Sequence, residues 1–141
     1  MNLTAKAQYA CLAMLELAAQ HGENHPVSIR EITSRHDVPQ PFLVQILLQL
    51  KRAGLITSSR GASGGYRLRH PPEMISLAQV LEATEGSSEE NHQFQPESPA
   101  TRVLARTWRQ VARVEHELLD NISLAKLTEE IQGQEANMYY I

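Results

Sequence analysis

Basic and amide side chains are concentrated between residues 35 and 70. This stretch holds six Lys or Arg against one acid, a local charge of +5 in a chain whose net charge is −3. Three glutamines, Gln40, Gln45 and Gln49, lie in the same stretch. A glutamine amide can pair with the edge of an adenine, and clustered lysine and arginine attract phosphate. The pattern therefore indicates binding to nucleic acid.

Two helices joined by a turn, at about residues 28–53, are expected to position these side chains. Ser28 and Glu31 have the spacing of a capping box, and residues 37–39 (Asp-Val-Pro) break the first helix. Gly54 ends the second helix, whose buried face consists of Leu43, Ile46, Leu47 and Leu50. The arrangement is a helix-turn-helix, in which the second helix fits the major groove of DNA.

A β-hairpin with a glycine-rich basic tip is expected at residues 55–69. Its strands are 55–57 and 66–69, joined by a turn from Arg60 to Gly65. Arg60 stands beside a glycine, where the backbone can approach another surface closely. The predicted fold is mainly α-helical with a small β-hairpin wing: a winged helix-turn-helix followed by a long C-terminal dimerisation helix.

Two other interpretations of these features remain open. A run of charged residues is often a solvated face, and helix-turn-helix topology also occurs in protein-interaction adaptors that do not bind DNA. The combination with a basic, glycine-rich wing favours DNA, because an adaptor does not need clustered wing arginines.

The segment QPFLVQILLQLKRAGLI, followed by SSRGASGGYRL, resembles the signature of the Rrf2 family of bacterial winged-helix repressors. The resemblance extends from LTAKAQYACLAMLEL near the start to LLDNISLAKL near the end. It implies that Gln45 and its neighbours read bases in the major groove and that Arg60 enters a minor groove. Many relatives carry an acidic residue where this chain has Val44.

The predicted DNA contacts come from both the helix-turn-helix and the wing. Phosphate contacts from Lys51, Arg52 and Arg67 would make the affinity sensitive to salt. The full set is Ser28, Gln40, Val44, Gln45, Gln49, Lys51, Arg52, Ser58, Arg60, Ser63, Tyr66 and Arg67.

A length of 141 residues suggests one domain. We expect a winged helix-turn-helix region at 1–82, a mobile acidic loop at 83–99, a dimerisation helix with a short docking helix at 100–133, and an apolar tail at 134–141. The first region carries a charge of +2 (eight Lys or Arg, six acids) and the remainder −5 (five and ten). No apolar run approaches the ~20 residues of a membrane span, and no signal peptide is visible. A cytoplasmic protein without a membrane partner is expected.

The chain has one cysteine, Cys11, on the apolar stripe of a first helix expected at residues 3–20. We interpret it as a small buried apolar side chain rather than a redox switch or metal ligand. Cluster-binding members of the resembled family carry three cysteines in the loop, where this chain has none, so no metal or other cofactor is expected. A metal-, cluster- or redox-sensing regulator of that family is the alternative.

No enzyme is expected. The six histidines are scattered, and no Ser/His/Asp set is suggested by spacing. The GASGG segment lacks the lysine and the following helix of a phosphate loop.

A long helix is expected from Ser98-Pro99, an N-cap followed by proline, to about Asp120. Its apolar seam consists of Leu104, Trp108, Val111, Val114 and Leu118. Such a seam packs either on its own domain or on a second copy. We favour a homodimer, whose two-fold symmetry would present two recognition helices to a pseudo-palindromic operator.

A last short helix is expected from residue 122 to Gly133, followed by a tail that ends in Met138, Tyr139, Tyr140 and Ile141. A frayed terminus is normally polar, so an apolar ending predicts docking. The ending resembles that of the cluster-free branch of the family, which represses cysteine metabolism. This implies a partner, cysteine synthase (O-acetylserine thiol-lyase), whose active site would take Ile141. The alternative is that the tail packs on its own dimer.

Overall fold

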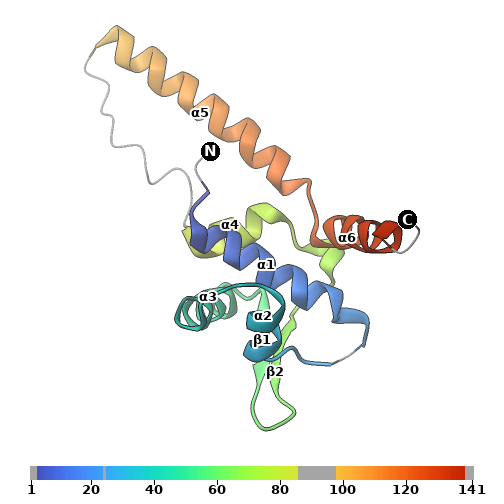
Figure 1. Cartoon of the computed structure of the whole chain (residues 1–141). Coiled ribbons are helices and arrows are strands. Elements are labelled where there is room, and N and C mark those ends of the chain that lie inside the picture. The colour runs from blue at the N-terminus through green and yellow to red at the C-terminus, as the bar shows by residue number, and fades with distance from the viewer. Residues whose placement is uncertain (1–2, 24, 86–97, 139–141) are drawn as a thin grey trace.

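The computed structural model describes residues 3–23, 25–85 and 98–138. Figure 1 shows helices packed around a central α1, with a β-hairpin on one side and a long helix extending away from the body. The elements in chain order are α1 (Ala5–Ala19), η1 (His21–Glu23), α2 (Ile29–Arg35), α3 (Gln40–Arg52), β1 (Ile56–Ser59), β2 (Gly65–Leu68), η2 (Pro72–Met74), α4 (Leu77–Glu85), α5 (Pro99–Asp120) and α6 (Leu124–Met138). The mainly α-helical fold with a hairpin wing is confirmed.

Local signals set the helix boundaries. The Thr4 hydroxyl accepts a hydrogen bond from the Ala7 amide at 3.1 Å, which caps α1. At α2 the Glu31 amide donates to Ser28 Oγ at 3.1 Å, and the Ser28 amide donates to the Glu31 carboxylate at 3.0 Å. Helix α3 ends at Arg52. Gly54, which follows the C-cap residue Ala53, has a φ of 79° and donates its amide to the Lys51 carbonyl. The expected capping box and C′ glycine are therefore both present.

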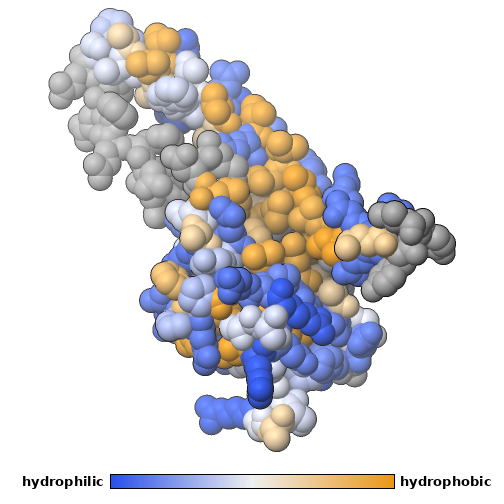
Figure 2. All heavy atoms as spheres, viewed as in Figure 1, coloured by the Kyte–Doolittle hydropathy of each residue, from blue (hydrophilic) through white to orange (hydrophobic). Residues whose placement is uncertain are grey.

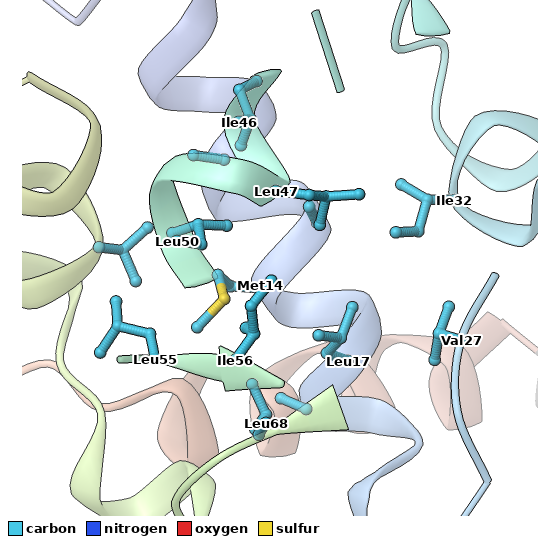
Figure 3. Packing of buried hydrophobic residues seen from close by; sticks show 14 of the residues in the cluster. Met14, Leu17, Val27, Ile32, Ile46, Leu47, Leu50, Leu55, Ile56 and Leu68 are labelled. Atoms are coloured by element: carbon cyan, nitrogen blue, oxygen red, sulfur yellow. The ribbon is translucent and has the colours of Figure 1, made fainter. Parts of the chain in front are cut away.

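The core lies between α1, α3 and the base of the hairpin. Figure 3 shows side chains from these elements and from Val27 and α2 pointing toward one another. The four residues expected to form the buried face of α3 are all buried. They meet side chains from the other elements, which include Met14, Leu17, Ile32, Ile56 and Leu68. This packing fixes the orientation of α3, because one face of the helix is fully used by the core.

The hairpin is held to the body by a short bridge to Val27. The Val27 amide donates to the Tyr66 carbonyl at 2.9 Å, and the Tyr66 amide donates back at 2.8 Å. Gly65 makes this approach possible, since a Cβ there would lie 2.5 Å from the Val27 carbonyl oxygen. The register pairs Ile56 with Leu68 and Ser59 with Gly65. The wing is therefore fixed relative to the start of α2.

The expected strand bounds were wrong by one or two residues. The first strand begins at Ile56 and continues to Ser59, and the second runs from Gly65 to Leu68. Leu55 does not begin the strand because its amide bonds the Leu50 carbonyl, as part of the helix end. Arg69 lies just beyond the ladder, although its amide still donates to the Leu55 carbonyl.

The expected end of the last helix at Gly133 was also wrong. Helix α6 passes through Gly133 and continues to Met138. Nothing lies within 4 Å of the position that a Cβ would take at Gly133, so no close approach depends on this glycine. A glycine inside a helix costs about 1 kcal/mol relative to alanine. The flanking glutamine, glutamate and alanine residues are good helix formers and offset this cost. Tyr139, Tyr140 and Ile141 lie outside the described residues, as does the loop at 86–97.

Helix α5 projects from the body and has no buried residue in the single chain. Its start is capped by Ser98, with Pro99 in the first turn as expected. Its C-terminal part meets α4, where His116 Nδ1 lies 3.3 Å from Glu82 Oε1. No helix among the described residues has both the length and the apolar character needed to cross a membrane.

Candidate nucleic-acid interface

The outward face of α3 carries the predicted base-reading residues. Gln45 and Val44 are exposed on this face, as is Gln40 at the start of the helix. Gln49 is only half-buried, and its Oε1 atom is buried without a hydrogen-bond partner among the described residues. Gln45 is therefore the glutamine in mid-helix whose amide group is best placed to reach a base edge.

The wing and the end of α3 are joined by a hydrogen bond. Lys51 Nζ donates to Ser58 Oγ at 2.7 Å, which connects the last turn of α3 to β1. Arg52 is exposed in the same turn. Both cations lie at the C-terminal end of α3, where they also complement the helix dipole. The contact places α3 and the wing on one side of the molecule.

The wing tip presents Arg60 and Ser63 to solvent. Gly61 has a φ of 105°, a conformation that favours glycine, and nothing lies within 4 Å of the position of an added Cβ. At Gly64 a Cβ would overlap the Ser59 carbonyl oxygen, so the tip can only be this tight with glycine there. The glycines therefore give the tip its shape and leave the Arg60 guanidinium free to extend outward.

A groove of about 600 Å³ separates the wing from α2 and the start of α3. Ser28 and Tyr66 line it, although the Ser28 hydroxyl already caps α2 and both residues are half-buried. Sequence reasoning missed three further polar residues in its wall: Arg30, Thr33 and Ser59. The signal was available, because Arg30 and Thr33 are three residues apart on the polar side of the first helix. A groove with a guanidinium and hydroxyl groups in its wall suits a sugar–phosphate backbone.

One of the six basic residues counted in the sequence points away from this surface. The Arg35 guanidinium lies 2.8 Å from the Glu16 carboxylate of α1, and His36 Nε2 lies 3.1 Å from the other carboxylate oxygen. Glu16 is itself buried. Arg35 therefore ties the end of α2 to α1. The other five basic residues of the stretch are exposed: Lys51, Arg52, Arg60, Arg67 and Arg69. Arg67 is exposed on β2, beside a smaller pocket that His21 and His25 also line.

Comparison with known proteins assigns the family. The model of the Rrf2 family, described as an iron-dependent transcriptional regulator, matches residues 3–130. The chain belongs to the Rrf2 family. The resemblance expected from the helix-turn-helix and wing is thus confirmed.

Relatives match over nearly the whole chain. The regulator CymR of Bacillus subtilis is 34% identical over 142 residues and is covered completely, as is this chain. A putative helix-turn-helix transcriptional regulator of Synechocystis is 37% identical, with coverage of 90% of this chain and 87% of the relative. The solved structure of B. subtilis CymR has a TM-score of 0.79 at 32% identity and covers 92% of this chain and 98% of that one. The Rrf2 protein described here is therefore a transcriptional regulator of the winged-helix type and not an enzyme.

The description of the family mentions iron, but this chain does not supply the cysteine ligands that an iron–sulfur cluster needs. Iron–sulfur clusters are held mainly by several cysteine thiolates, and the chain has only Cys11. That side chain is half-buried against the core, and burial raises the pKa of its thiol. Within residues 3–23, 25–85 and 98–138, no group of three or more His, Cys, Asp or Glu side chains could hold a metal ion. The residues do not fit a thiolate-bound cluster.

Proposed function

We propose that this Rrf2 protein is a sequence-specific DNA-binding repressor that acts as a homodimer on a pseudo-palindromic operator. The single observation that carries the proposal is the shared orientation of α3 and the wing. The Lys51–Ser58 hydrogen bond joins them, and the groove beside the wing is lined by polar residues of α2 and the wing and by Gln40 at the start of α3. A helix in the major groove with a basic wing beside it can contact bases and backbone together.

In this proposal each part of the surface has a separate task. Gln45 and its neighbours read base edges, and Lys51, Arg52 and Arg67 contact phosphates. Arg60 enters the minor groove, where a narrow groove concentrates negative potential. The phosphate contacts fix the register of the protein on the duplex, while sequence preference comes from α3 and the wing tip.

The dimer part of the proposal rests on α5. Val103, Leu104, Trp108, Val111, Val114 and Leu118 are each at least half exposed in the single chain. Figure 2 shows apolar side chains gathered along α5 and continuing onto the body below it. A contiguous apolar surface of this kind marks a protein interface. The heptad spacing favours α5 of a second copy as the partner helix.

The test is a selection of duplexes from a random 30-base-pair library by the full chain, followed by fluorescence anisotropy titrations. Enrichment of a motif with two related half-sites is expected, with an affinity that falls ~10³-fold or more between about 50 and 200 mM salt. Arg60→Ala should weaken binding by ~1–3 kcal/mol. Lys126→Ala, which removes an exposed charge on α6, is the control and should have no effect. Failure to enrich any sequence contradicts the proposal.

A finer part of the proposal concerns control of cysteine metabolism through cysteine synthase. The supporting observation is the full-length similarity to CymR, the global cysteine regulator of B. subtilis. Ile141 would enter the active site of the enzyme, and Tyr139 and Tyr140 would pack at its rim. All three lie outside the described part of the chain. Deletion of Ile141 should abolish binding to purified cysteine synthase in calorimetry, whereas Glu135→Ala should not. Unchanged binding after the deletion excludes this role for the tail.

A further inference from the structure

The outward face of α3 is more apolar than a polar recognition surface requires. Leu48 is 45% exposed and Val44 is 49% exposed, although both belong to a helix whose buried face is already complete. Neither residue belongs to the core cluster or packs against it. Sequence reasoning did not single out Leu48 at all.

Helix geometry places these side chains together. Successive residues turn ~100° about the helix axis, so residues three and four apart are neighbours on the surface. Leu48 therefore adjoins both Val44 and Gln45. Leu48 faces away from the buried row of Leu43, Leu47 and Leu50, beside Gln45, which lies near the middle of the opposite side. We call Val44, Gln45 and Leu48 the reading face.

Charge around the reading face limits what can cover it. Lys51 and Arg52 follow in the last turn of α3, and the exposed Arg60 extends from the wing. The partner must therefore be anionic at the edges and apolar at its centre. The major groove of DNA meets both conditions, because its rim is phosphate and its floor carries the 5-methyl group of thymine.

We propose that Leu48 and Val44 contact thymine 5-methyl groups in the major groove and that Gln45 pairs with a base edge beside them. The inference rests on the proposed function and deepens it, since it names the residues and the base that specify the operator. A leucine cannot accept or donate a hydrogen bond, so its only contribution to base discrimination is contact with an apolar group.

The experiment replaces thymine by deoxyuridine, one position at a time, in the duplex selected from the random library. Deoxyuridine keeps every hydrogen bond of thymine and removes only the methyl group. Wild-type protein should lose roughly fourfold in affinity at one or two positions of each half-site, the effect expected for loss of one buried methyl group. Leu48→Ala should bind more weakly and become insensitive to uracil at one of these positions.

Met74→Ala is the matched control. Met74 is 70% exposed on η2, which packs against α6, so this variant should keep the uracil sensitivity of the wild type. Selected half-sites that contain no thymine, a uracil scan without effect, or Leu48→Ala with unchanged uracil sensitivity would each overturn the inference while leaving DNA binding intact. A library from which no motif is enriched contradicts the proposed function itself. A protein partner on the reading face would be indicated if Leu48→Ala left DNA affinity unchanged at every sequence, and this too overturns the inference.

Discussion

Helices α3 and α5 have similar apolar periodicity and opposite environments. Helix α3 buries its four core residues against α1, α2 and the hairpin, whereas α5 buries none of its residues in the single chain. Trp108 alone is 52% exposed. Periodicity therefore reports that a helix has an apolar face, but it does not report what covers that face. The apolar face of α3 is covered within one chain, whereas the apolar face of α5 is left exposed.

The largest expected effect is on the α5 surface. Trp108→Asp places a charge in the proposed dimer interface twice, once per chain, and should weaken the dimer by ~4–8 kcal/mol. Light scattering at rising concentration should show a monomer, while circular dichroism should show an unchanged helix content. Arg109→Asp makes a larger charge change on the polar side of the same helix and should leave the dimer intact. A dimeric Trp108→Asp variant would remove α5 from the interface.

A smaller effect is expected in the core. Leu47→Ala should lower the free energy of unfolding by ~2–5 kcal/mol, because it leaves a cavity beside α1. The measurement is urea denaturation at two protein concentrations. The loss should be the same at both, since Leu47 is covered by its own chain. A loss in unfolding free energy that grew on dilution would contradict the claim that the apolar face of α3 is covered within one chain.

The capping boxes of α2 and α5 allow a more sensitive comparison. Ser28→Ala should cost ~0.5–2 kcal/mol and should also weaken DNA binding, because Ser28 caps α2 beside the groove. Ser98→Ala removes the corresponding cap of α5, where Thr101 completes the box. It should destabilise the dimer and leave the monomer fold unchanged. Thermal unfolding and anisotropy with the selected duplex distinguish the two results.

The smallest effect concerns Cys11. Burial raises the pKa of its thiol above the ordinary value of 9.0, so the folded protein holds less thiolate than the unfolded chain near pH 8–9. Alkylation by iodoacetamide should therefore be slower in the folded protein than in urea. Because the unfolded thiol ionises first, stability should fall slightly as the pH rises past 9. Equal alkylation rates in the folded protein and in urea would show that the face of α1 around Cys11 is accessible to solvent.

Much of the fold could be predicted because its signals are local. The Ser28–Glu31 box, the Gly54 helix end and the glycines of the wing act through contacts within a few residues. The interface was harder, because its members depend on contacts between distant elements. Arg35 belongs to the basic stretch of the sequence, but its guanidinium donates to Glu16, nineteen residues earlier in the chain. Gly133 failed as a helix end because a glycine stops a helix only where the chain must turn.

The most direct test of the account is the mass of the complex between the wild-type protein and the selected duplex. Sedimentation equilibrium should find a free protein of twice 15.8 kDa and two chains on each duplex. This result would show that the protein reads DNA as a dimer, which is what the exposed apolar stripe of α5 predicts. A single chain bound to the duplex with full affinity and selectivity would contradict the central claim.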